Sequence, residues 1–298
     1  MELLTAPAYV IVNPAARGAR RALARARAAF AAAGVPVEVA CTAGAGDAAR
    51  LAADAPRDGG TLFVLGGDGT VMEVVGALAH SGRPVGILPG GTGNLVARAI
   101  GVPPDAGRAA ALLLRGRAIP LDLGVLADGR RFAFSTSVGI DARMIAETRP
   151  AAKRWFGVGA YALTALRGVL ACRRFDVRAE VDGEAREGPA VDVMLANLGR
   201  VLGGVMVLGP DIRGDDGLLD LCVYSPGNPV EAAVVAWRLF RKRFAGARAM
   251  AYRRGRAFRV TCDPPQLVQA DGEVIGTTPF EACVEPAAAM LLVPAGHD

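Results

Sequence analysis

The chain has 298 residues, with 34 Lys and Arg against 29 Asp and Glu, and a formal net charge of +5. A 52% hydrophobic composition with so low a net charge excludes an intrinsically disordered chain, and the length predicts two domains. Five scattered cysteines without a CxxC pair argue against a disulfide scaffold or a thiolate zinc site and favour a reducing cytosol. With two His and two Lys, neither Lys in a GxxxxGK[ST] loop, the sequence argues against a catalytic His triad, a His-based metal site and a Walker-type ATPase. We also expect neither a transmembrane helix nor a signal peptide.

The first 125 residues alternate short β-branched strands with Ala-rich helices. This alternation predicts parallel β-α-β units, in which ligands bind beyond the carboxyl ends of the strands. The expected strands are Tyr9–Val12, Pro36–Ala40, Thr61–Leu65 and Val85–Leu88. The expected helices are Arg20–Ala33, Asp47–Ala55, Val71–Ala79, Asn94–Ile100 and Asp105–Arg115.

From about Leu126 the sequence becomes rich in strands with longer connections. It predicts a mostly antiparallel β domain over residues 126–288, with helices near Gly157–Ala171 and Pro229–Phe244. We expect residues 289–298 to return to the first domain through a strand at Met290–Val293. The remaining strands are expected at Arg131–Val138, Phe175–Val181, Val191–Ala196, Leu219–Tyr224, Phe258–Cys262, Gln266–Ala270 and Pro279–Val284.

Three glycine-rich loops follow the first, third and fourth strands. They read NPAARG (13–18), GGDGT (66–70) and PGGTGN (89–94). Glycines let the backbone approach a ligand closely, and a helix N-terminus attracts anions, so phosphate is the expected guest. Asp68 adds a carboxylate that could reach a magnesium ion or a ribose. The alternative for GGDGT is a tight strand–helix turn with Thr70 as N-cap, but two such loops on adjacent strands favour a shared binding site.

The order of these loops resembles the diacylglycerol kinase catalytic-domain family, specifically the soluble bacterial lipid kinases related to sphingosine and ceramide kinases. The resemblance implies an N-terminal domain of the NAD kinase and phosphofructokinase type that binds ATP and Mg²⁺. GGDGT alone is shared with NAD kinases and phosphofructokinases. Two positions depart from the family pattern: Met72 stands where Asn is frequent and Leu95 where Asp is common. The implied nucleotide contacts are Asn13, Thr42, Gly66, Gly67, Asp68, Gly69, Thr70, Val71, Met72 and Thr92.

Three further motifs extend the resemblance into the second domain: LDLG (121–124), DIRGDDGLLDL (211–221) and QADGE (269–273). They imply Asp271 as the general base, supported by Asp122. They also imply a structural magnesium held by the Arg213 carbonyl, the Asp216 carboxylate and the Leu218 carbonyl, an oxygen set that suits a hard cation. The alternatives are an Asp-Asp-Gly turn at 215–217 and a hairpin turn at Asp271.

The resemblance therefore implies an ATP-dependent lipid kinase that phosphorylates the hydroxyl of a diacylglycerol-like or sphingoid lipid. An NAD kinase-like phosphotransferase and a non-catalytic nucleotide- or lipid-binding regulator stay open as alternatives. A Rossmann dehydrogenase is disfavoured, because the GxGxxA pattern within CTAGAGDA follows the second strand and no catalytic His or Lys lies downstream.

The positive charge is concentrated in two stretches without acidic residues, Arg149–Arg174 and Arg238–Arg259. They carry +15 between them and leave −10 for the rest, which indicates an anionic partner or only a solvated arginine-rich face. No nucleic-acid-binding motif accompanies them. Val230–Phe244 reads instead as an amphipathic helix, either interfacial on anionic lipid or packed with its aromatic side chains in the core. We expect a cytoplasmic protein, peripheral to the inner face of the membrane, with homodimerisation left open.

Overall fold

The computed structural model describes residues 7–56, 60–140, 142 and 174–296. The chain divides into two compact units, residues 1–121 with 287–298 and residues 122–286, where the sequence predicted boundaries at 125/126 and 288/289. The predicted helix near Gly157–Ala171 and the basic stretch up to Arg173 lie outside the described residues. No helix within the described ranges is long and apolar enough to cross a membrane.

The first unit contains a parallel sheet in the order β2-β1-β3-β4. Its strands are β1 (Ala8–Val12), β2 (Val37–Cys41), β3 (Thr61–Gly66) and β4 (Pro84–Pro89). The end of β18 (Phe280–Val293) extends this sheet, with Met290 and Leu291 paired in parallel to Pro84 and Val85. The interiors of β1, β3 and β4 are apolar and buried, as expected for a sheet covered on both faces. The parallel α/β architecture predicted for this domain is confirmed.

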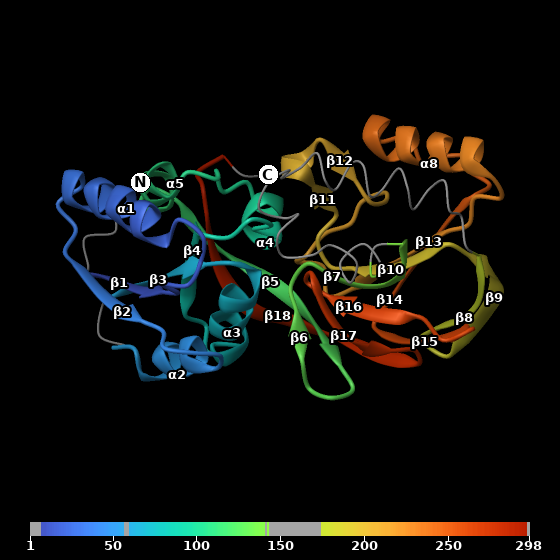
Figure 1. Cartoon of the computed structure of the whole chain (residues 1–298), viewed down its shortest axis with the longest axis horizontal. Coiled ribbons are helices and arrows are strands. Elements are labelled where there is room, and N and C mark those ends of the chain that lie inside the picture. The colour runs from blue at the N-terminus through green and yellow to red at the C-terminus, as the bar shows by residue number, and fades with distance from the viewer. Residues whose placement is uncertain (1–6, 57–59, 141, 143–173, 297–298) are drawn as a thin grey trace. The chain divides into compact units, whose positions relative to one another are not determined.

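Helices pack on both faces of that sheet (Figure 1). The helices are α1 (Ala19–Ala32), α2 (Asp47–Asp54), α3 (Asp68–Ala77), α4 (Leu95–Ala99) and α5 (Ala106–Leu113). Helices α1 and α5 pack against each other on one side, and α2 packs against α3 on the other. Phe30 of α1 meets Phe63 of β3 edge to face, with ring centroids 5.0 Å apart.

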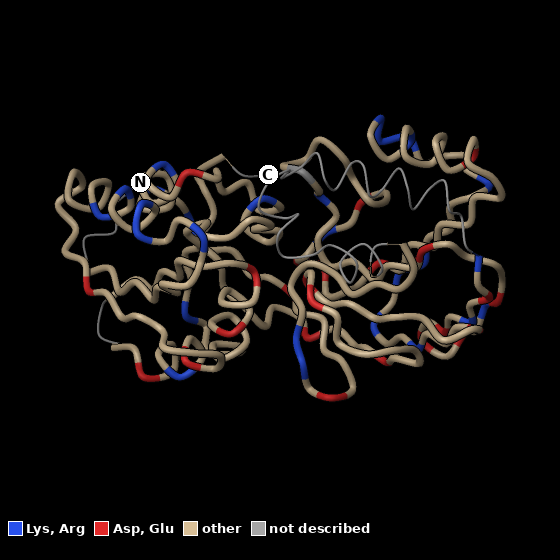
Figure 2. The backbone as a smooth tube through the Cα atoms, in the orientation of Figure 1, with Lys and Arg blue, Asp and Glu red and all other residues tan. Residues whose placement is uncertain are grey.

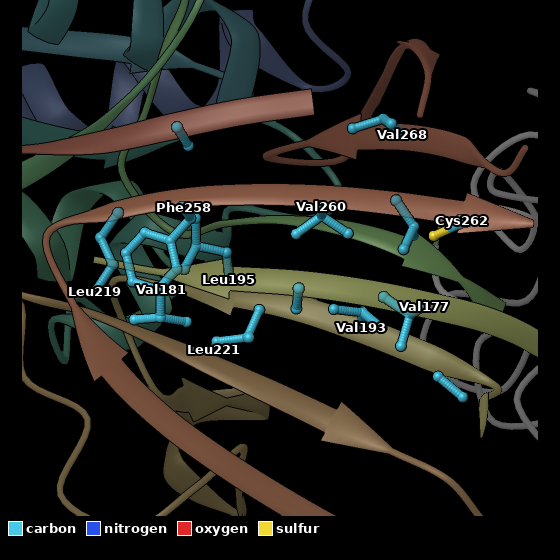
Figure 3. Packing of buried hydrophobic residues seen from close by; sticks show 14 of the residues in the cluster. Val177, Val181, Val193, Leu195, Leu219, Leu221, Phe258, Val260, Cys262 and Val268 are labelled. Carbon is cyan, nitrogen blue, oxygen red and sulfur yellow. The ribbon is translucent and has the colours of Figure 1, made fainter. Parts of the chain in front are cut away.

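The second unit is antiparallel throughout its described strands. One sheet has the order β14-β13-β10-β7-β16-β17, and the first part of β18 pairs with β15, which continues to β8 and β9. Alternate side chains of these strands form one apolar core, seen in Figure 3 with Val193, Leu221 and Val260. The strands are β7 (Ser135–Gly139), β8 (Phe175–Val181), β9 (Glu184–Ala190), β10 (Asp192–Ala196), β13 (Leu219–Tyr224), β14 (Met250–Gly255), β15 (Ala257–Asp263), β16 (Leu267–Ala270) and β17 (Glu273–Thr277).

The remaining elements are β5 (Arg117–Leu126), β6 (Arg131–Phe132), β11 (Arg200–Val201), a 3₁₀ turn at Leu202–Gly204, β12 (Met206–Val207) and helix α8 (Pro229–Arg241). The strand expected at Arg131–Val138 is interrupted between Phe132 and Ser135, where main-chain amides turn to a side chain described below. Strand β9 escaped the sequence analysis because its residues are polar and mostly exposed, and β14 because its arginines obscure the alternation.

Candidate active site

The GGDGT loop connects β3 to α3 in the first unit. β3 ends at Gly66, Gly67 is the N-cap, and α3 begins at Asp68. Thr70 lies one turn inside the helix and is buried, so the alternative that made it the N-cap is wrong. Gly67 has no side chain to cap the helix, and the first amides of α3 therefore face the loop. Such a terminus is a ready anion-binding element.

The PGGTGN loop lies directly against the GGDGT loop. A Cβ atom added at Gly91 would lie 2.6 Å from the Gly67 Cα, so any side chain there would push the loops apart. The Gly90 amide donates to the Gly66 carbonyl at 2.9 Å, and the Leu95 amide donates to Asp68 Oδ1 at 2.6 Å. The two loops predicted to meet are thus held together by close backbone contact and by the Asp68 carboxylate.

The Asn13 loop joins the same cluster. Asn13 Nδ2 donates to Thr70 Oγ1 at 2.9 Å, while the main-chain N–H of Asn13 donates to the Leu65 carbonyl near the end of β3. The Thr42 amide donates to the Val12 carbonyl at 2.9 Å, which places Thr42 beyond β2 at the same sheet edge. All three glycine loops therefore meet at the carboxyl ends of β1, β3 and β4.

The predicted contact residues differ in what they expose. Thr92 is exposed and Met72 half-buried, whereas the Val71 and Thr42 side chains are buried. Val71 can therefore offer a ligand only its main chain. Burial raises the pKa of the Asp68 carboxyl, and the amide hydrogen bond from Leu95 opposes this by stabilising the charge.

Glu73 was not among the predicted contact residues. Its Oε2 accepts a hydrogen bond from the Ala48 amide at 3.1 Å, near the N-terminus of α2. The contact ties α3 to the segment that follows Thr42. The sequence signal was its place three residues beyond Thr70, on the first turns of the helix.

Asp271 lies in the β16–β17 hairpin of the second unit. It has a left-handed backbone, with φ of 45°, and is followed by Gly272 with φ of 90°, as a type I′ turn requires. Its carboxylate accepts hydrogen bonds from three consecutive main-chain amides that lead from β6 into β7: Ala133 at 2.8 Å, and Phe134 and Ser135 at 2.9 Å. The hairpin turn expected as the alternative at Asp271 is therefore present, and the interruption of the predicted strand holds its carboxylate.

Asn197 connects Asp271 to Asp122. Its Nδ2 donates to the Asp122 carbonyl at 2.7 Å and to the Ala133 carbonyl at 2.8 Å, and it is fully buried. The Asp122 carboxylate in turn accepts a hydrogen bond from the Gly217 amide at 2.7 Å. Asp122, Asn197, Asp271 and the Asp215–Leu218 turn thus belong to one hydrogen-bonded network. Asn197 was missed because a lone Asn after a buried strand has no motif.

The expected metal-ligating residues lie around that turn. Asp216 Oδ1 accepts a hydrogen bond from the Leu218 amide at 3.1 Å, while the Arg213 side chain pairs with Asp215 at 3.2 Å. The turn is an Asp-Asp-Gly turn, with Gly217 at φ of 73°. Within the described residues no three His, Cys, Asp or Glu side chains converge, so a cation here would need main-chain carbonyls.

Arg254 partly neutralises the carboxylates beside the turn. It pairs with Asp220 at 3.0 Å and approaches Asp216 at 3.7 Å. Asp220 is 5% exposed, its Oδ2 accepts no hydrogen bond from the described residues, and burial raises the pKa of its carboxyl. The unpartnered, buried Asp220 oxygen and the Asp216 carboxylate are hard oxygen donors of the kind that Mg²⁺ prefers.

Two family models match the chain. The diacylglycerol kinase catalytic domain matches residues 7–126, and the YegS C-terminal NAD kinase beta sandwich-like domain matches residues 134–293. An uncharacterized protein of Synechocystis is 30% identical over 79% of this chain, which spans 55% of that relative's length. The diacylglycerol kinase of Bacillus subtilis is 30% identical over 280 residues, 92% of each chain.

Solved structures share the fold. A crystal structure of a protein from Bacillus anthracis superposes over the whole of both chains with a TM-score of 0.82 and 25% identity. A second crystal structure from Bacillus anthracis, of a diacylglycerol kinase, superposes over 98% of both chains with a TM-score of 0.75 and 22% identity. The two matched domains and the aligned length of the Bacillus subtilis relative show that this chain belongs to the diacylglycerol kinase catalytic-domain family, as a member of the bacterial lipid kinase type.

Proposed function

We propose that this protein is an ATP-dependent lipid kinase that phosphorylates the hydroxyl of a diacylglycerol-like or sphingoid lipid. The observation that carries the proposal is the packing of three glycine loops at the carboxyl ends of β1, β3 and β4. Gly67 and Gly91 are in backbone contact there, beside the open N-terminus of α3. Family membership supports a lipid kinase activity.

The loops of the first unit bind the phosphates of ATP in this proposal. Glycine backbones and the amides of the α3 N-terminus supply hydrogen-bond donors, so no Walker-type lysine is needed. Thr92 offers an exposed hydroxyl, and Asn13 orients Thr70 through its side-chain hydrogen bond. Mg²⁺, when bound with ATP, neutralises charge on the transferred phosphoryl group. Asp68 is the carboxylate of the cluster that can face such an ion.

Asp271 acts as the general base. The lipid hydroxyl oxygen forms a bond to the γ-phosphorus, its proton passes to the Asp271 carboxylate, and the bond to the ADP oxygen breaks. Three amides fix the position of this carboxylate and stabilise its negative charge. Asn197 is a positioning residue, because its side chain holds the Ala133 carbonyl of the segment that supplies those amides, and Asp122 supports it through the carbonyl that Asn197 also binds.

Magnesium bound at the Asp215–Leu218 turn, with Arg213, Asp216 and Leu218 as ligands, would stabilise the second unit. The buried, unpartnered oxygen of Asp220 supports a cation in this neighbourhood. We expect added Mg²⁺ to raise the melting temperature of the parent protein and to leave that of Asp216→Ala unchanged. A melting temperature of the parent that is the same with Mg²⁺ and with a chelator would remove the structural metal.

The test of the function is phosphoryl transfer from γ-labelled ATP to a panel of acceptors. The panel contains diacylglycerol, sphingosine, ceramide and NAD, with Asp271→Asn as the inactive control. Label on a lipid supports the proposal and names the acceptor. Label on NAD would instead assign the alternative activity of an NAD kinase-like phosphotransferase, in line with the name of the matched C-terminal domain. Absence of label on every acceptor, with ATP still bound, would leave a nucleotide-binding regulator.

A further inference from the structure

Helix α8 has apolar side chains on two opposite faces. Ala232, Val235 and Leu239 are buried against the second unit. The opposite face carries Val230, Val234, Trp237 and Phe240, which are 74%, 46%, 52% and 54% exposed. Spacings of three and four residues place these four side chains in one stripe. An amphipathic surface helix would carry polar residues on this face. Exposed apolar side chains grouped in this way mark a surface that binds another molecule.

The structure argues against one of the two interpretations of this segment. A helix packed with its aromatic side chains in the core would bury Trp237 and Phe240, and it does not. Of the three aromatic residues of the segment, Phe244 alone turns inward, with its ring 5.9 Å from that of Tyr252. The exposed stripe runs along a helix of 13 residues, about 20 Å long.

Positive charge lies at the C-terminal end of α8 (Figure 2). The helix ends at Arg241, its C-cap Lys242 has a left-handed backbone, and the Arg243 amide donates to the Arg238 carbonyl at 2.9 Å. Arg241, Lys242 and Arg243 are exposed, and no acidic residue among those described forms an ion pair with them. The end of the helix therefore presents three cations beside Trp237 and Phe240.

The acidic residue of the helix lies at its N-terminal end, where its carboxylate accepts hydrogen bonds. Glu231 accepts hydrogen bonds from the Gly227 amide at 2.7 Å and from Asn228 Nδ2 at 3.2 Å, while Asn228 caps the Glu231 amide. From Ala232 to Cys262 the sequence has no Asp or Glu. An anion can thus approach the aromatic and basic part of α8 without meeting an opposing carboxylate on that segment.

We propose that the exposed face of α8 docks on an anionic lipid bilayer, with Trp237 and Phe240 at the level of the headgroups and Arg241, Lys242 and Arg243 on their phosphates. This deepens the proposed lipid kinase function, since a diacylglycerol acceptor is itself embedded in such a surface. Amphipathic ring systems favour the membrane interface, and basic residues beside them gain from the negative surface potential. The occupant chosen is lipid because the face combines aromatic and basic residues and carries no unengaged acid.

The experiment measures co-sedimentation of the full chain with vesicles of phosphatidylcholine alone or with 30 mol% phosphatidylglycerol, a composition chosen at roughly the charge density of anionic membranes. We expect binding only to the anionic vesicles, at least about tenfold weaker for Trp237→Ser/Phe240→Ser. Arg241→Gln/Lys242→Gln is expected to weaken binding about fivefold per charge and to reduce its salt dependence.

Matched controls come from exposed positions elsewhere. Val274→Ser removes an exposed apolar side chain from β17, and Arg27→Gln/Arg186→Gln removes the same charge from α1 and β9. Both are expected to bind anionic vesicles like the parent. Parent-like binding by Trp237→Ser/Phe240→Ser, or equal losses in the controls, would overturn the proposal. A dimeric parent that this variant converts to a monomer would also overturn it, because the face would then meet a second copy.

An activity measurement separates docking from the kinase proposal. Trp237→Ser/Phe240→Ser should lose activity on diacylglycerol presented in anionic vesicles and keep parental activity on a short-chain diacylglycerol below its aggregation concentration. Equal activity of variant and parent on both substrates would overturn the docking role. A parent that binds anionic vesicles through α8 and phosphorylates no lipid would refute the kinase function alone.

Discussion

The Asp271→Asn substitution tests the general base directly. Asp271 Oδ1 accepts two amides, from Phe134 and Ser135, and Oδ2 accepts the Ala133 amide at 2.8 Å. An asparagine keeps one oxygen for the first pair but turns its amide group toward the Ala133 N–H. Asn tolerates the left-handed φ of 45°, so the backbone adds no strain. The change thus removes one charge and one buried hydrogen bond.

Each loss has its own magnitude. A buried amide left without its acceptor costs about 1–3 kcal/mol, which for a unit of this size lowers the melting temperature by about 2–12 °C. Removal of a general base lowers the rate by about 10²–10⁴-fold. Because the second effect exceeds what partial unfolding produces below the transition, the two can be measured apart.

The assay compares initial rates of lipid phosphorylation with circular-dichroism melting, at a temperature where parent and variant are both folded. Asn197→Ala is the matched control, since it loosens the same Ala133 main chain while keeping the Asp271 charge. A folded Asp271→Asn protein with more than a tenth of the parental rate would refute the assignment. Asn197→Ala is expected to lose less activity than Asp271→Asn, because it loosens the position of the carboxylate and leaves the base itself in place.

Three further changes have expected outcomes. Gly91→Ala should destabilise the first unit by about 1–3 kcal/mol in urea unfolding and weaken ATP binding, because the added Cβ would lie 2.6 Å from the opposite loop. Gly76→Ala is the control: Gly76 lies within α3, and a Cβ added there would meet no atom within 4 Å. This change should stabilise the unit by up to about 1 kcal/mol. Because burial raises the folded pKa of Asp68 above the unfolded value near 3.8, its charge destabilises the folded unit at pH 7. Asp68→Asn should therefore melt at a higher temperature than the parent at pH 7, an advantage that disappears as the pH falls through the raised pKa, while ATP turnover drops. Arg254→Gln should destabilise the second unit by about 1–3 kcal/mol, since Asp220 keeps its burial and loses its cation, and parental stability in urea would contradict this.

The local pattern of the sequence was enough to predict much of the fold. Strands β1, β3 and β4 are continuous apolar runs followed by glycines, which is how parallel strands covered on both faces read. β9 was not predictable in the same way, because it is an edge strand with an exposed surface and no apolar alternation. Strand β5, with polar and apolar halves, was likewise missed.

The candidate site shows the same division. The glycine loops could be found from the sequence because glycine is conspicuous there, and at Gly91 the structure requires it, since a Cβ atom would lie 2.6 Å from the Gly67 Cα. Asn197 could not be found, because its role depends on two carbonyls, 75 and 64 residues away along the chain. The position of the Asp271 carboxylate likewise depends on hydrogen bonds from amides more than 130 residues before it.

By itself the sequence determined the apolar strands β1, β3 and β4, the three loops and the concentration of positive charge, because each is local in the chain or in its composition. Only the tertiary structure decided which basic side chains form ion pairs and which stay exposed to solvent. Arg253, Arg254 and Arg259 are paired with Glu184, Asp220 and Glu281, whereas Arg241, Lys242 and Arg243 lie exposed at the end of α8. It also placed Trp237 and Phe240 outside the core. Pairing and burial depend on residues brought together by folding, so they cannot be read from neighbours in the sequence.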